Sequence, residues 1–128
     1  MLQRNGGSNG PYRLVFKMRK VSKKQTAINK ELHKVYKEIE ETRGHYCTGC
    51  GRSDVPLSHS HYIARSRRKD LETAIDNITY HCLSMGGRKG CHDLWEGGIS
   101  DKQKLLDYPK AMEYILEQDT ELYFLLTE

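Results

Sequence analysis

Large apolar side chains are scarce in this sequence. Its 128 residues include two Phe and one Trp, and apolar residues make up 37% of the chain. No apolar run approaches the roughly 20 residues that a membrane-spanning helix requires. The apolar stretch at residues 12–18 is interrupted by Arg13 and Lys17, so it lacks the continuous centre of a signal peptide. We therefore exclude membrane, collagen-like and coiled-coil proteins and expect an intracellular, cytoplasmic protein.

The shortage of large apolar residues also bears on stability. A chain of this length fits one compact domain with short appendages. Such a domain buries roughly 68% of the surface of its unfolded chain. With so few large apolar residues, the core is expected to need an additional stabilising element, such as a bound metal.

Positive charge is concentrated at the N-terminal end of the chain. The formal net charge is +4, but residues 1–37 contain ten Lys and Arg and a single acid, which gives +9. Residues 38–99 carry −1 and residues 100–128 carry −4. A segment this positive attracts polyanions, although a solvated basic arm without a partner would have the same composition.

The residue pattern divides the chain into four segments. Residues 1–21 are rich in Gly and basic residues, and we expect a flexible basic arm there. In residues 22–43, apolar residues recur at spacings of three and four among lysines, which predicts an amphipathic basic helix. Residues 44–98 hold all four Cys and five of the six His, so the chemistry is expected there. Residues 99–128 are expected to form a C-terminal appendage of short helices.

The four cysteines have the spacing of a zinc site. Cys47 and Cys50 form a C-x2-C pair followed by Gly51, and Cys82 and Cys91 supply two more thiols. Four thiolates suit one tetrahedral Zn²⁺, which would also stabilise the small core. The alternatives are two disulfides, four unrelated buried thiols or a redox C-x2-C pair, and neither an export signal nor a βαβ pattern supports them. Three histidines are possible substitute ligands: His45, His81 and His92.

A second group of polar residues lies between the cysteines and beside them. The alternation in residues 57–63 predicts a strand that carries His59 and His61, followed by a basic loop. Asn77 comes sixteen residues after His61, at the start of a second short strand. His92 follows fifteen residues later, in a segment of helical character next to the last cysteine.

These pieces resemble the HNH endonuclease family, in which a ββα-metal fold is framed by a zinc knuckle. The C-x2-C pair, the strand around His61, Asn77 with Cys82, and Cys91 with His92 follow the order of that family. The pattern is similar to small HNH proteins common in bacteriophages. The resemblance implies an α+β fold, with a small ββα-metal core between the basic N-terminal helix and the short C-terminal helices.

The resemblance also implies an activity, the metal-dependent hydrolysis of phosphodiester bonds in DNA. His61 would be the general base, Asn77 would fix the loop that presents it, and His92 would hold one Mg²⁺ or Mn²⁺. The chemistry agrees, because histidine titrates near neutral pH and a cation offsets the charge that develops on the phosphorus centre. Six basic side chains would bind nucleic-acid phosphates: Arg65, Arg67, Arg68, Lys69, Lys23 and Lys24.

One position departs from the family pattern. Ser60 stands directly before His61, where the family usually has an Asp or His that binds the metal. A hydroxyl is a poor ligand, so either the metal has fewer protein ligands or His59, on the same strand face as His61, takes that role. Two other functions stay open: a non-catalytic zinc-binding module that binds nucleic acid, and a protein-interaction domain in which zinc only stabilises the fold.

Overall fold

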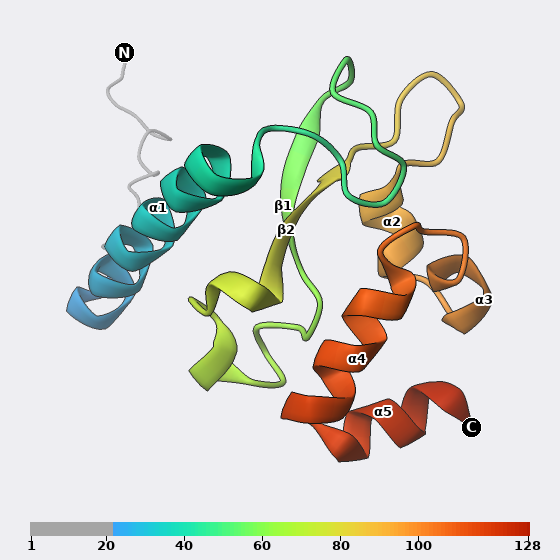
Figure 1. Ribbon diagram of the computed structural model, residues 1–128. Helices are drawn as coiled ribbons and strands as arrows, with labels where there is room; N and C mark the ends of the chain where they lie inside the picture. Colours follow the sequence, from blue (N-terminus) through green and yellow to red (C-terminus); the bar gives the residue numbers. More distant parts are fainter. Residues whose placement is uncertain (1–21) are drawn as a thin grey trace, which may run out of the picture. The chain divides into compact units, whose positions relative to one another are not determined.

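The computed structural model describes residues 22–128, so the expected basic arm at residues 1–21 lies outside the described residues. The elements are α1 (Lys23–Arg43), β1 (Leu57–His61), two 3-10 turns η3 (Lys69–Leu71) and η4 (Ile75–Asn77), β2 (Ile78–Cys82), α2 (Cys91–Trp95), α3 (Ile99–Lys102), α4 (Tyr108–Gln118) and α5 (Thr120–Thr127) (Figure 1). The fold is α+β, as the sequence predicts. Over residues 22–128, no helix is long and apolar enough to cross a membrane.

Helix α1 covers the segment for which the sequence predicts an amphipathic helix. Its buried side chains lie three and four residues apart: Leu32, Val35 and Ile39. The helix ends before Gly44, whose φ of 88° and backbone bond to the Glu40 carbonyl are typical of a C-terminal glycine cap. The boundary between two structural units follows Lys30, inside α1, and the cysteines, core and cleft described below all belong to residues 31–128.

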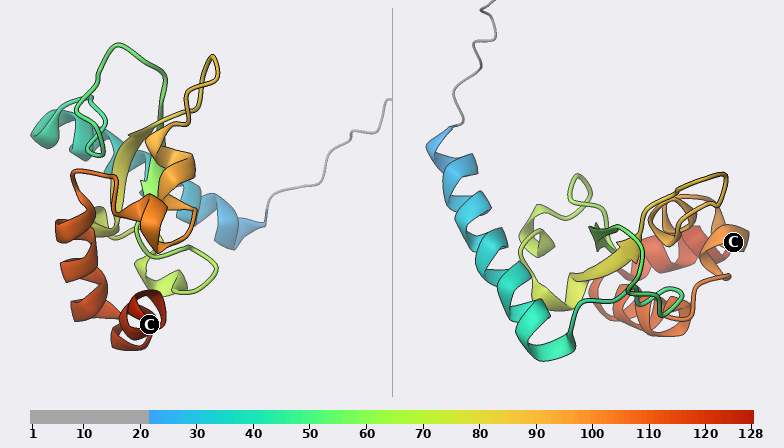
Figure 2. Two further views of the ribbon diagram at one scale, coloured as in Figure 1. Left: turned by 90° about the vertical axis from the view of Figure 1, so that its right-hand side faces the viewer. Right: turned by 90° about the horizontal axis from the view of Figure 1, so that it is seen from above.

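The sheet consists of β1 and β2, which pair antiparallel. Leu57 lies opposite Cys82 at one end, and His61 lies opposite Ile78 at the other. Strand β2 is buried along its whole length, and α2 lies against it, as both views in Figure 2 show. The register therefore places Cys82 and His61 at opposite ends of the two-stranded sheet.

The core is assembled around the cysteines. Its buried cluster has ten members: Cys47, Tyr62, Ile63, Cys82, Cys91, Trp95, Leu105, Ala111, Met112 and Ile115. Three of these ten are cysteines, so the apolar core and the sulfur cluster are one packing unit.

A buried carboxylate joins three segments beside the core. The Asp107 side chain accepts hydrogen bonds at Oδ2 from Thr48 Oγ1 at 2.7 Å, Tyr62 OH at 2.6 Å and His81 Nε2 at 3.0 Å. Thr48 belongs to the C-x2-C turn, Tyr62 follows β1, and His81 lies in β2. We call these four residues the Asp107 cluster. They connect the cysteine turn to the sheet and to the start of α4.

The C-terminal helices form a pair. Pro109 lies in the first turn of α4, where its missing N–H costs nothing. Asp119 caps α5 by accepting a hydrogen bond from the Leu122 backbone N–H at 3.1 Å. Figure 2 shows α4 and α5 side by side at the C-terminal end of the chain. The predicted short C-terminal helices are therefore present.

Candidate functional site

The four cysteines converge on one point. Their Sγ atoms all lie within 4.8 Å of one another, and Cys50 Sγ lies 3.8 Å from Cys82 Sγ. A tetrahedral ion with Zn–S bonds of about 2.3 Å separates its sulfur atoms by about 3.8 Å. All four thiols are free, so the alternative of two disulfides is not what the structure has. The cluster could hold a metal such as zinc, as the spacing predicts.

The backbone of the C-x2-C turn is shaped to bring the sulfurs together. A side chain at Gly49 would lie 2.8 Å from Cys91 Sγ, so only glycine fits between the two cysteine pairs. Gly51 has a φ of 85°, a left-handed conformation that glycine adopts without strain. The glycines therefore permit the close approach of Cys91 to the turn.

Hydrogen bonds to sulfur favour the thiolate form at Cys82. Burial opposes ionisation of this thiol, but bonds from the Cys91 backbone N–H and the Arg88 guanidinium outweigh it and lower the pKa of Cys82 to about 7. The Arg88 Nη atoms lie 3.6 and 3.7 Å from Cys82 Sγ. Burial and the neighbouring sulfur Cys47 raise the pKa of Cys91. A bound dication would offset the negative charge of four thiolates, as it does in four-cysteine zinc sites.

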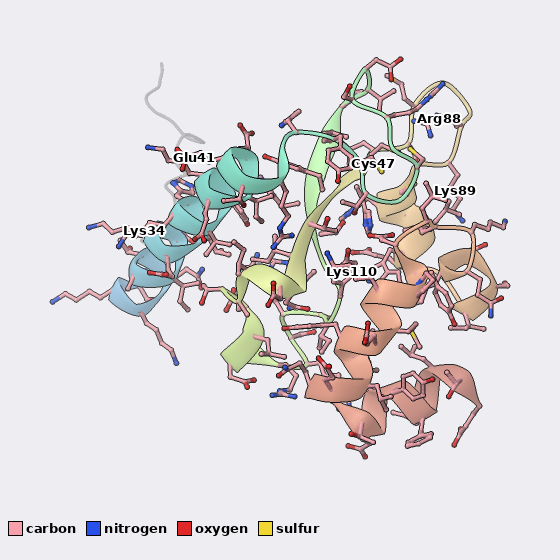
Figure 3. The ribbon with its side chains drawn as sticks, in the orientation of Figure 1. Lys34, Glu41, Cys47, Arg88, Lys89 and Lys110 are labelled. Atoms are coloured by element: carbon pink, nitrogen blue, oxygen red, sulfur yellow. The ribbon has the colours of Figure 1, made fainter. Side chains whose placement is uncertain are left out.

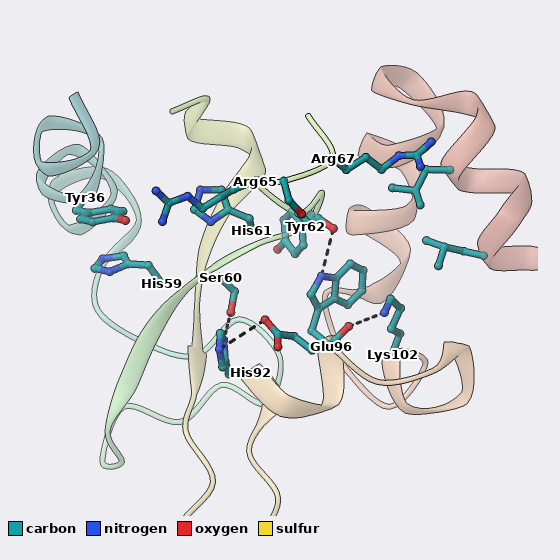
Figure 4. A pocket seen from close by; sticks show the side chains of 15 residues that line it. Tyr36, His59, Ser60, His61, Tyr62, Arg65, Arg67, His92, Glu96 and Lys102 are labelled. Carbon is teal, nitrogen blue, oxygen red and sulfur yellow. Dashed lines mark hydrogen bonds and ion pairs between the residues drawn. The ribbon is translucent and has the colours of Figure 1, made fainter. Parts of the chain in front are cut away.

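A cleft of about 760 Å³ lies at the His61 end of the sheet. His59, His61, His92 and Arg65 all line it, together with Glu96 (Figure 4). The structure therefore brings His61 and His92 into one cavity, although they come from different elements and are far apart in the sequence.

The orientation of His61 is fixed by one hydrogen bond. Its Nε2 lies 2.8 Å from the Glu72 carbonyl oxygen. A carbonyl can only accept, so Nε2 carries the proton and Nδ1 of the neutral ring is free to accept one. Burial lowers the pKa of His61, an effect that the Glu72 carbonyl partly offsets. Burial thus favours the neutral form of the ring, which is the form that a general base requires.

Asn77 holds the loop between the two strands. Its side chain is fully buried and makes three hydrogen bonds. Oδ1 accepts from the Ile63 N–H at 2.8 Å, and Nδ2 donates to the carbonyls of Ile63 and Leu71, each at 3.1 Å. The residue after Leu71 is Glu72, whose carbonyl orients His61. Asn77 thus holds the loop segment that precedes the Glu72 carbonyl, and its role in presenting a general base stays a prediction.

Helix α2 presents His92 and Glu96 on one face. His92 Nε2 lies 3.8 Å from Glu96 Oε2, one helical turn away. Ser60 Oγ lies 2.7 Å from His92 Nδ1. Ser60, which stands where the HNH pattern usually has Asp or His, thus contacts the His92 ring. The hydroxyl orients this ring and leaves Nε2 facing Glu96 (Figure 4). The C-terminal end of α2 is held in turn by Lys102, whose Nζ donates to the Trp95 carbonyl at 2.6 Å.

His59 lines the same cleft as His92, but its ring makes other contacts. Side chains alternate along a strand, and it is Ser60 that contacts His92. The His59 ring stacks on Tyr36, with ring centroids 3.6 Å apart, and tilts against Tyr80. The suggestion that His59 supplies the missing metal ligand stays a prediction.

The basic loop is engaged in ion pairs. Arg65 pairs with Glu72, and Arg67 Nε donates to Asp119 Oδ2 at 2.8 Å. Arg68 binds Asp70 through two nitrogen atoms. The other three basic residues expected to bind phosphate are exposed: Lys69, Lys23 and Lys24. On α1, Lys34 also projects away from the helix axis (Figure 3). The arginines thus hold the loop, while the lysines are available to a polyanion.

The pairing of Arg67 with Asp119 leads to a stability prediction. Asp119→Ala removes both the α5 cap and the carboxylate that holds Arg67, so we expect a loss of about 1–2 kcal/mol in unfolding free energy. Urea denaturation followed by circular dichroism measures it. Glu113→Ala, at an exposed position of α4, is the matched control and should stay within about 0.5 kcal/mol of the parent. Equal stability of the two variants would contradict the structural role of Asp119.

Sequence reasoning missed Glu96, which lines the cleft, and Glu72, which bonds to the cleft residue His61. Glu96 lies four residues after His92, a spacing that places two side chains on one helix face and could have revealed it. Glu72 acts on His61 through its backbone carbonyl, which leaves no signal in the sequence. No protein-family model, curated protein or solved structure matches the chain.

Proposed function

We propose that the chain is a metal-dependent DNA endonuclease of the HNH type, with His61 as the general base. The observation that carries the proposal is the hydrogen bond from His61 Nε2 to the Glu72 carbonyl. It leaves Nδ1 free to take a proton from water, in the same cleft as His92 and Glu96. The order of β1, β2 and α2, with Asn77 before β2, supports the same reading.

The residues that would hold a catalytic metal are His92 and Glu96. One imidazole nitrogen and one carboxylate, 3.8 Å apart, suit a divalent cation that keeps positions open for water and a phosphate oxygen. Ser60 Oγ lies 2.7 Å from His92 Nδ1 and orients the ring; in the tautomer whose Nδ1–H donates to this hydroxyl, Nε2 is free to bind a metal. A bound Mg²⁺ or Mn²⁺ would supply positive charge against the charge that develops on the phosphate.

Residues outside the cleft would position the base and the nucleic acid. Asn77 holds the loop after β1 through the carbonyls of Ile63 and Leu71. The exposed lysines of α1 supply a positive surface, which agrees with the +9 charge of residues 1–37. Binding through such a surface depends strongly on salt, because each phosphate that is neutralised releases counterions.

The test is cleavage of supercoiled plasmid in Mg²⁺, Mn²⁺ or EDTA. His61→Ala should lower the rate by about 10²–10⁴-fold, since a general base contributes that much. Glu96→Gln should raise the metal concentration needed for half-maximal rate. His33→Ala, an exposed histidine on α1, is the matched control and should cleave at the parental rate.

Two results would overturn the proposal in different ways. Equal rates of nicking by the parent and by His61→Ala would show that His61 is not the general base. Salt-sensitive DNA binding without cleavage in any of the metals would instead favour a non-catalytic zinc-binding module that binds nucleic acid. Metal analysis of each preparation confirms that the zinc content is the same in all variants.

A further inference from the structure

We infer that Arg65 is a positioning residue for His61, which acts by holding Glu72 so that the Glu72 carbonyl stays against the imidazole. The inference rests on the proposed role of His61 and changes the role of Arg65, which the sequence assigned to phosphate binding. It also assigns a purpose to Glu72, a buried acid at the end of a loop that is rich in basic residues.

The Arg65–Glu72 pair is closely made and partly buried. Arg65 Nε donates to Glu72 Oε2 at 2.7 Å, and its Nη2 contacts the same carboxylate oxygen. The Glu72 side chain is 7% exposed, whereas that of Arg65 is 45% exposed. A carboxylate with so little access to water needs a charged partner, and Arg65 is the cation that the structure places on it.

The pair controls the direction of one carbonyl. Asn77 Nδ2 holds the Leu71 carbonyl, which fixes the peptide group before Glu72. Arg65 holds the side chain of Glu72 itself. The carbonyl that follows is the acceptor for His61 Nε2. With the preceding peptide and the side chain both fixed, Glu72 has little freedom to turn this carbonyl away from the imidazole.

The same geometry argues against phosphate as the main partner of Arg65. Moving Arg65 onto a phosphate would leave the Glu72 carboxylate buried and unpaired, which is strongly unfavourable. Figure 4 shows Arg65 beside His61 within the cleft, so its loss acts directly on the surroundings of the base. The neighbouring exposed Lys69 is free of this constraint and is a better candidate for contact with phosphate.

A double-mutant cycle tests the inference in the zinc-loaded full chain. Arg65→Gln should lower kcat by about 10- to 100-fold, because small misplacements of a catalytic group have effects of this size. KM for plasmid and the salt dependence of binding should not change. Glu72→Gln keeps the carbonyl and removes the buried charge, so adding Arg65→Gln to it should lower kcat by less than about threefold.

Arg65→Lys separates positioning from phosphate binding without removing the charge. Lysine keeps the attraction to phosphate but lacks the planar group that makes two contacts with Glu72. We expect kcat to fall with KM unchanged. This variant also keeps a cation on Glu72, so it guards against an Arg65→Gln protein that fails to fold.

A spectroscopic readout is independent of cleavage. The imidazole ¹⁵N chemical shifts of His61, recorded where the ring is neutral, should show one tautomer with the proton on Nε2 in the parent. In Arg65→Gln they should show a mixture of both tautomers. If no variant cleaves DNA, the proposed function fails, yet this measurement still decides the inference. An unchanged tautomer in Arg65→Gln, or a raised KM with kcat unchanged, would overturn it.

Discussion

Removal of zinc is expected to abolish the cooperative unfolding transition of this protein. Structural zinc sites contribute an apparent 10–16 kcal/mol or so at neutral pH, which is comparable with the whole stability of a small domain, about 5–15 kcal/mol. Here three of the ten residues in the buried cluster around the sheet are cysteines. Without the metal, these thiols lose the centre that holds the C-x2-C turn, the end of β2 and the start of α2 together.

Chelation followed by thermal melting and metal analysis measures this effect. A strong chelator should remove one zinc per chain and leave a circular dichroism signal without a sharp transition, and added Zn²⁺ should restore it. Replacement by Co²⁺ should produce the visible absorption of a tetrahedral thiolate site. A melting curve that is the same with and without the chelator, in a protein that contains no zinc, would rule out the metal site.

Cys50 is the most informative ligand to substitute because it is exposed. If the cysteines were only buried thiols, Cys50→Ser would change little, since an exposed side chain contributes little packing. If Cys50 binds zinc, its loss should destabilise the protein by several kcal/mol, on the order of a lost metal ligand. Ser53→Ala, at a nearby exposed position, is the matched control.

The elements that follow from local patterns are the ones that the sequence predicts well. The spacing of Leu32, Val35 and Ile39 defines a helix over a few turns, and α1 ends one residue before a glycine that can cap it. The C-x2-C pair and the two later cysteines predict a sulfur cluster, and the four Sγ atoms do converge. These predictions succeed because each depends on residues close together in the chain or on one strong chemical preference.

The contacts that depend on strand register and tertiary pairing are the ones that the sequence does not reveal. Whether Ser60 or His59 faces His92 depends on which face of β1 meets α2, and the alternation of residues alone does not say so. Arg67 pairs with Asp119, 52 residues away. Nothing in a run of arginines indicates that an acidic turn between two later helices neutralises it, so composition overstates the positive charge of this loop.

Asp107→Ala should destabilise the protein by about 3–5 kcal/mol, the usual cost of breaking a buried charged network on one side. Asp107 accepts hydrogen bonds from Thr48, Tyr62 and His81, and only 7% of its surface is exposed. Burial raises the pKa of this carboxyl, but the three hydrogen bonds outweigh burial and hold the pKa below its ordinary value. Alanine would remove this acceptor from the buried Tyr62 hydroxyl and His81 Nε2, whereas Thr48 Oγ1 keeps Thr79 Oγ1 and the Tyr80 carbonyl as partners.

Two controls show whether the loss of stability in Asp107→Ala comes from the cluster, rather than from a lost helix cap or from the removal of a negative charge. Asp107 precedes α4, but its side chain makes no capping hydrogen bond there, so a loss of stability reports on the cluster rather than on the helix. Asp54→Ala, at an exposed position, should change the unfolding free energy by no more than about 0.5 kcal/mol. Tyr62→Phe removes one of the three bonds and should cost about 1 kcal/mol. Urea denaturation of the zinc-loaded variants gives all three values.

The Asp107 cluster also predicts an effect of Asp107→Ala on zinc retention. Thr48 lies between Cys47 and Cys50, whereas Tyr62 immediately follows the strand that carries His61. Loss of the carboxylate should therefore weaken zinc retention as well as stability, measured as faster transfer of zinc to a chelator. A variant that unfolds more easily yet retains zinc at the parental rate would show that the cluster supports the sheet alone. Faster release would show that the carboxylate couples the cysteine turn to the end of the sheet where His61 lies.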